Sequence, residues 1–214
     1  MDIKHSLTYF RKQEGWIKIY GALIIAIFVG AIPIIGTIIY PIFQFGYMTV
    51  LTNHRIFKPE IPLAQWDTGK IFKAGAKAAS PIIALAIVLN IIANGISKNP
   101  ELAIQIAFPL CAICLIFGII YDLALLVFMT NLKFNSMFKT NAMKFILIDN
   151  CKEYIVFSLI KFFITICFLI VTAISAITLI GPILLMPSLL FIIADLNAQF
   201  LRKIFKINTN PTQG

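Results

Sequence analysis

Long uncharged stretches separated by short basic segments are the dominant pattern along the chain. These stretches repeatedly reach the roughly 20 residues that an α-helix needs to cross a hydrocarbon layer about 30 Å thick. The pattern predicts an all-α fold, a polytopic membrane helix bundle of about six spans with interfacial amphipathic helices. The expected spans are 17–33, 37–54, 80–96, 101–130, 153–177 and 182–201. They make up a single membrane domain over 1–207, followed by a short polar tail over 208–214.

Proline and glycine interrupt two of the apolar blocks that could otherwise form one long helix each. Pro33 and Gly36 lie within the first block, and Gly181 and Pro182 lie within the last. Proline removes a backbone donor and glycine loosens the helix, so such clusters end or kink a span. We therefore expect a tight turn on the outer side of the membrane at each place.

The two interruptions resemble each other. IIGTIIYP (34–41) is similar to LIGPILLMP (179–187), and each is followed by a helix that ends in polar and basic residues. Basic amphipathic stretches precede both units, at 1–14 and 134–152. The pattern indicates an internal repeat whose halves are parallel, because both copies start on the same side. Chance similarity between isoleucine-rich helices is the alternative explanation.

The composition agrees with lipid as the solvent. Apolar residues make up 60% of the 214 residues and charged residues 13%, against roughly 45–50% and about 25% in soluble domains. A soluble core could not hide so much apolar surface.

The basic residues border the expected spans and give them an orientation. Four segments hold all but two of the 18 lysines and arginines: Lys4, Arg11, Lys12 and Lys18; Arg55, Lys58, Lys70, Lys73 and Lys77; Lys133, Lys139, Lys144 and Lys152; Arg202, Lys203 and Lys206. The positive-inside rule places these segments in the cytoplasm. A cytoplasmic-membrane location with both termini cytoplasmic follows. The net charge of +9 then indicates anionic lipid head groups as partners, and not nucleic acid.

The cytoplasmic segment PEIPLAQWDTGKIFKAGAKAAS (59–80) is the most distinctive stretch. Trp66 is the candidate interfacial anchor, and Asp67 is a suitable N-cap for a short helix. Three lysines form a basic stripe on that helix: Lys70, Lys73 and Lys77. We expect an interfacial helix that leads into the third span, and whether it also docks a partner is open.

At these residues the chain resembles a known family. GYMTVLTNHRIFKPEIPLAQWD (46–67), after IPIIG and before GKIFKAGAKAA, is similar to the pattern of an uncharacterised prokaryotic membrane-protein family, domain of unknown function 4013. The resemblance runs from about residue 18 to about residue 203 and includes Asp195 and Gln199. Similar six-span modules include the membrane domain attached to some glycerophosphodiester phosphodiesterases. The resemblance implies a multi-pass inner-membrane protein and no activity, because the catalytic domain of those enzymes is not in this sequence.

The sequence offers little catalytic or metal-binding chemistry. A C-x-x-C pattern at Cys111 and Cys114 lies inside an expected span without a second ligand pair, so packing is its simpler role. Motifs for zinc hydrolysis, a nucleophile elbow and a phosphate-binding glycine loop do not occur. We therefore expect no cofactor, no metal site and no enzymatic activity.

Polar residues inside the expected spans are the remaining candidates for function. Asp195, Lys161, Asp122 and Gln44 are the main ones. A charge in the membrane costs at least about 2.5–3.5 kcal/mol on insertion scales, so we expect each to be paired or to face water. Lys161 and Asp195 lie at similar depths on the fifth and sixth spans, which predicts an ion pair between them. Asp122 is then an unexplained acid, either functional or structural.

Three function classes fit these observations. A membrane scaffold or accessory subunit with a protein partner in the membrane agrees best with the basic cytoplasmic surfaces. A small secondary transporter or channel-like carrier would use the intramembrane acids. A lipid-modifying enzyme would need an acid–base cluster at the head-group level, for which Asp122, Asp149 and Glu153 are a poor start.

Overall fold

Every regular element in the described part of the protein is helical, as the sequence predicts. The structure is a computed structural model that describes residues 2–3, 6, 21–25, 27–28, 35–58, 67–96, 100–175 and 180–207. Its elements are α3 (Ile35–Phe57), α4 (Thr68–Ile96), α5 (Pro100–Asn131), the 3-10 helix η2 (Phe134–Phe138), α6 (Thr140–Lys144), the π-helical turn η3 (Phe145–Asp149), α7 (Cys151–Ser175) and α8 (Ile180–Phe205). Residues 21–25 and 27–28 are also helical.

Four helices in the described residues are long and apolar enough to cross a membrane. They are Thr68–Gly95, Gln105–Asn131, Cys151–Ser175 and Leu185–Phe205. Their number and composition suggest a multi-pass membrane location. The full count of six spans and the sidedness of the chain stay predictions, and most of the expected first span lies outside the described residues.

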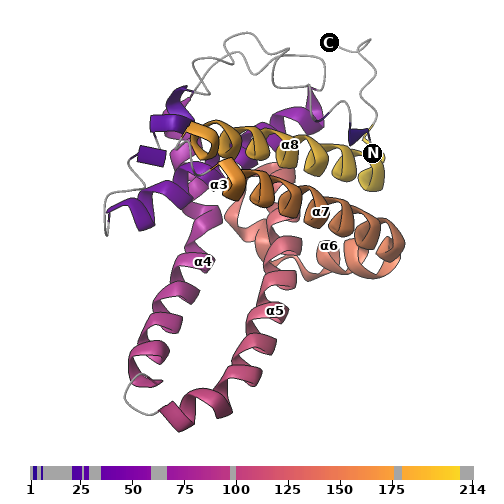
Figure 1. The fold of residues 1–214 in the computed structure, drawn as a ribbon. Helices are drawn as coiled ribbons and strands as arrows, with labels where there is room; N and C mark the ends of the chain where they lie inside the picture. The colour runs from indigo at the N-terminus through magenta and orange to yellow at the C-terminus, as the bar shows by residue number, and fades with distance from the viewer. Residues whose placement is uncertain are drawn as a thin grey trace.

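The last apolar block is divided into two helices, as expected. Helix α7 ends at Ser175, α8 begins at Ile180, and the two run side by side in opposite directions (Figure 1). Phe157 of α7 stacks on Phe200 of α8 with ring centroids 4.3 Å apart. The turns expected at Pro33 and Gly36 and at Gly181 and Pro182 are not observed at the glycines, because Gly36 lies in the first turn of α3 and Gly181 and Pro182 lie in the first turn of α8. Pro33 and residues 176–179, which connect α7 to α8, lie outside the described part.

Two prolines of the repeated motif do not end a helix. Pro41 lies inside α3 and Pro187 inside α8. Each lies about two turns from the start of its helix, and in an apolar setting neighbouring helices can satisfy the backbone groups that a proline frees. The two similar motifs therefore lie at the beginnings of two helices, α3 and α8.

The expected short interfacial helix is not a separate element. Helix α4 runs without a break from Thr68 to Ile96 through Pro81, a length of about 44 Å at 1.5 Å per residue. The expected start is confirmed, because the Asp67 carboxylate accepts a hydrogen bond from the Lys70 amide at 2.9 Å. The lysine stripe is therefore the first part of a long helix, whose backbone hydrogen bonding continues into the apolar segment.

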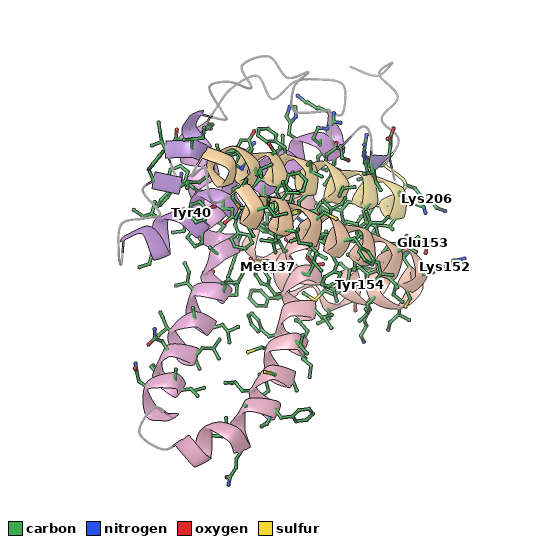
Figure 2. The ribbon with its side chains drawn as sticks, viewed as in Figure 1. Tyr40, Met137, Lys152, Glu153, Tyr154 and Lys206 are labelled. Carbon is green, nitrogen blue, oxygen red and sulfur yellow. The ribbon has the colours of Figure 1, made fainter. Side chains whose placement is uncertain are left out.

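The apolar helices do not share one axis. Helices α4 and α5 run down the picture and project away from the other elements, whereas α7 and α8 run across it (Figure 1). The side chains of the projecting halves of α4 and α5 point into open surroundings, as Figure 2 shows. The helices of the predicted membrane bundle are therefore not aligned along one common axis. A physical reason is that no other described helix covers the far halves of α4 and α5, so the direction of these helices is set where they join the rest.

The hydrophobic core lies where α3, α5 and α8 meet the first turns of α4 and α7. Its largest fully buried side chains include Tyr47, Phe128, Phe157, Phe191 and Phe200. Helix α8 is the central element, because 67% of its candidate span is buried, against 6% for α7. Apolar side chains on α4, α5 and α7 stay exposed, which is the surface that a lipid-facing helix presents.

Two glycines let α3 and α4 cross closely. A Cβ atom at Gly46 would overlap the carbonyl oxygen of Ile71, and one at Gly75 would overlap that of Ile42. Small residues at a crossing let helix backbones approach, which is how many helices in lipid associate. This contact fixes the beginning of α4 against the core.

Helices α3 and α8 contact each other and run in the same general direction. Tyr47 meets Phe191 with ring centroids 5.4 Å apart, and further along both helices Arg55 meets Asp195. Two parallel repeat halves would place their equivalent helices in this way. The repeat itself stays a prediction.

Candidate functional site

A buried ion pair joins α3 to α8. Both the Nε and the Nη2 atoms of Arg55 donate to Asp195 Oδ1, at 3.1 and 2.9 Å. The Asp195 side chain is 0% exposed and that of Arg55 3%. A charge in such a place is stable only when it is paired and its remaining hydrogen-bonding capacity is used.

The other oxygen of the Asp195 carboxylate is also satisfied. Ser6 Oγ donates to Oδ2 at 2.7 Å, and Gln199 Nε2 donates to the same atom at 2.9 Å. The Asp2 amide donates to Gln199 Oε1 at 2.7 Å. The beginning of the chain is thus held against α8 by the same network that neutralises Asp195.

A second ion pair joins α5 to α7. Lys161 Nζ contacts Asp122 Oδ1, and the Tyr154 hydroxyl donates to Asp122 Oδ2 at 3.4 Å. The Lys161 ammonium also lies 5.5 Å from the centre of the Phe157 ring. The side chains of Lys161 and Asp122 are 25% and 26% exposed. The Lys161–Asp122 pair is therefore partly exposed at the protein surface, whereas the Arg55–Asp195 pair is buried.

The ion pair predicted between Lys161 and Asp195 is wrong, because each residue has a different partner. Equal depth on neighbouring helices is necessary for such a pair but does not fix which face of the helix carries the charge. Phe200 is the α8 residue that stacks on α7, and Asp195 is five residues earlier, about 140° around the helix. Asp195 therefore faces α3, where Arg55 meets it.

Sequence reasoning missed the role of Arg55. The residue was grouped with the cytoplasmic basic residues that follow the second span, because arginine at a helix end usually meets water or lipid head groups. Arg55 and Asp195 both lie within the part of the chain that resembles the family, but nothing in their spacing pairs them.

Neutral polar side chains complete the joint between α3, α5 and α8. Thr52 Oγ1 donates to the Ala194 carbonyl at 3.2 Å, and Asn53 Nδ2 donates to the Met129 carbonyl at 2.8 Å. Asn197 also contacts Met129, with its Nδ2 atom 3.6 Å from the sulfur. Thr52 thus links α3 to α8, and Asn53 and Asn197 link α3 and α8 to Met129 of α5.

The remaining candidates are placed as follows. Gln44 lines a cavity of about 10 Å³ together with Leu23, Ile27, Tyr40, Pro187 and Leu190. A volume of this size is at the lower limit for one water molecule. Trp66, the expected anchor, lies outside the described residues.

The lysine stripe lines an open groove. Lys70, Lys73 and Lys77 bound a cavity of about 430 Å³, together with Asp67, Gly69, Ala74 and Leu132. The three lysines are exposed, and within the described part of the chain no carboxylate forms an ion pair with them. The groove thus lies along the beginning of α4, and Leu132, the residue that follows α5, closes its other side.

The basic ends of α7 and α8 lie at the same end of the helix pair. Figure 2 shows Lys152, at the start of α7, and Lys206, after the end of α8, on the same side of the molecule. The positive-inside rule needs this placement if both ends are cytoplasmic.

Comparisons with known proteins add no relative. All four cysteines are free thiols, and the described residues contain no group of three or more metal-ligating side chains. No family model, no curated protein and no solved structure matches the chain. The resemblance to the family of unknown function accordingly stays a prediction, and the function is inferred from the geometry of the described residues.

Proposed function

We propose that this protein is a membrane-embedded scaffold or accessory subunit that presents a basic surface at the cytoplasmic face. The observation that carries the proposal is the pairing of both intramembrane acids. Asp195 is neutralised by Arg55 and Asp122 by Lys161. These charges hold α3 to α8 and α5 to α7, so their first role is to assemble the helices.

Extensive exposed apolar surface supports the same proposal. Ile155, Phe162, Phe163 and Ile174 lie exposed along α7. Lipid can cover such a surface, and so can the spans of another membrane protein, since shape complementarity drives helix association in lipid. Helix α7 is therefore the proposed contact for a protein partner.

The test is purification from membranes in a mild detergent, followed by identification and quantification of the co-purifying proteins. A scaffold or subunit is expected to retain a partner in fixed stoichiometry. Replacing Phe162 and Phe163 with Ala is expected to release it, whereas the same change at Phe108, which is also exposed but lies on α5, is expected to have no effect. Retention of no stoichiometric protein would contradict the proposal.

A small carrier is the second candidate, and the partial exposure of the Lys161–Asp122 pair favours it. An accessible acid beside a lysine can exchange a proton or a cation, which the closed Asp195 network cannot do without opening. Uptake by protein reconstituted alone in vesicles, abolished by Asp122→Asn and retained in Asp149→Asn, would establish this function in place of the scaffold.

A further inference from the structure

The groove between the beginning of α4 and the end of α5 has the charge of an anion-binding site. Three lysine side chains face it and one carboxylate, that of Asp67, reduces the net charge of its lining to +2. Asp67 is already occupied as the helix cap through the Lys70 amide. The lysine ammonium groups are thus the polar groups that are available for a ligand.

The position of the groove along α4 matches the head-group layer of a bilayer. After Lys77 the helix continues without a charged residue from Ala78 to Ile96. This segment of 19 residues is about 28 Å long, which is close to the hydrocarbon thickness of about 30 Å. Lys70 lies seven residues before Lys77, so it is about 10 Å further from the apolar segment along the helix axis. The polar layer on each side of the hydrocarbon is about 5–8 Å thick, so the three lysines cover its depth.

The surroundings of the groove suit a ligand that is charged at one end and apolar at the other. Leu132 forms part of the wall on the α5 side and packs against the hydrophobic core. Beyond the groove, Ile87, Val88 and Ile91 lie exposed along α4. An anion bound to the lysines would therefore have Leu132 in the same groove and the exposed side chain of Ile87 about 15 Å beyond Lys77 along α4.

We propose that this groove binds the phosphate of an anionic phospholipid, whose acyl chains lie along the exposed apolar side chains of α4. The net charge of +2 exceeds that of a single phosphodiester, and lysine is a common phosphate ligand. A free inorganic or soluble organic phosphate would satisfy the same ammonium groups, but it would leave the adjoining apolar surface unused. The site needs only a membrane location, so it can fail or stand independently of the scaffold role.

The experiment measures lipid contact by the fluorescence of Trp66, the residue that precedes Asp67 in the sequence. Trp16→Phe removes the other tryptophan. The protein is reconstituted in nanodiscs of phosphatidylcholine with a rising fraction of phosphatidylglycerol brominated in its acyl chains, which quenches nearby tryptophan. We expect half-maximal quenching at a phosphatidylglycerol fraction far below that needed when the brominated lipid is phosphatidylcholine.

Removing the lysines is expected to abolish the preference. Each lysine near an anionic surface contributes roughly fivefold to the affinity, so Lys70→Gln, Lys73→Gln and Lys77→Gln together are expected to reduce the preference by up to about 100-fold at low salt. The matched control changes three other exposed lysines, Lys139, Lys144 and Lys152, to Gln and is expected to retain it. Lys73→Gln alone, expected to cost roughly fivefold, serves if the triple variant does not fold.

Three results of the quenching experiment would overturn the proposal. They are an unchanged preference in the groove variants, an equal loss in the control variant, and equal quenching by brominated phosphatidylcholine and phosphatidylglycerol in the starting protein. Displacement of phosphatidylglycerol by millimolar glycerol phosphate would instead assign the groove to a soluble phosphate and also reject the lipid. Weakening by added salt, which screens charges beyond about 10 Å at 0.1 M, is expected if the lipid is bound as proposed.

Discussion

A double-mutant cycle on Arg55 and Asp195 tests whether the ion pair holds α3 to α8. Arg55→Met removes the guanidinium at similar volume, and Asp195→Asn removes the negative charge but keeps an oxygen that accepts from Ser6 and Gln199. The bond lengths of 2.9 and 3.1 Å and the complete burial of Asp195 place this pair in the class in which loss of one partner costs about 3–5 kcal/mol. Each single change is expected to cost at least about 3 kcal/mol, because it leaves a buried charge.

The double variant is expected to be no less stable than either single one, since no charge is then left in the interior. A coupling free energy of about 3 kcal/mol follows, a factor of more than 100 in the unfolding equilibrium. The measurement is unfolding in mixed micelles at rising dodecyl sulfate fraction, followed by far-ultraviolet circular dichroism. Additivity of the two losses to within about 0.5 kcal/mol would refute the reasoning.

A cross-cycle supplies the control. Lys161→Met combined with Asp195→Asn changes the two residues that depth alone would pair, yet in the structure Lys161 contacts Asp122 and Asp195 contacts Arg55. The losses are expected to add. Coupling in the cross-cycle and none between Arg55 and Asp195 would mean that the predicted pairing, and not the observed one, is correct.

Three further predictions concern other parts of the fold. Gly75→Ala is expected to lower the free energy of unfolding by about 1–3 kcal/mol, because the added Cβ would overlap the α3 backbone. The control Gly118→Ala, which has open space around it, is expected to leave the free energy of unfolding unchanged or to raise it by about 0.5–1 kcal/mol in the same assay. A single cysteine at Lys98 in a cysteine-free background is expected to react with an impermeant reagent in intact cells and one at Lys73 is not; labelling at position 73 would reject the orientation. Ser6→Ala is expected to cost about 1–3 kcal/mol, since it removes a donor from the buried carboxylate, and unchanged stability would show that the beginning of the chain is not held there.

The contacts at the beginning of the chain show how far local sequence can be informative. Residues 1–14 were expected to form an amphipathic interfacial stretch, and of these the structure describes Asp2, Ile3 and Ser6. Nothing in their own spacing indicates that Ser6 reaches Asp195, 189 residues away. A hydrogen bond between distant segments depends on how the helices are stacked, which periodicity does not encode.

The all-helical class, the approximate limits of the apolar helices, the division of the last block and the Asp67 cap all follow from the sequence by itself. They are local properties, since the length of an uncharged run, a missing proline donor and a capping carboxylate act within a few residues. The tertiary structure alone decided that Asp195 pairs with Arg55, that Lys161 pairs with Asp122, and that the lysine-bearing helix and the third span are one helix, α4, which crosses α3 at two glycines. The physical reason is that a residue's depth along a helix can be counted from the chain, whereas the face that it turns to a neighbour is set by the packing of whole helices.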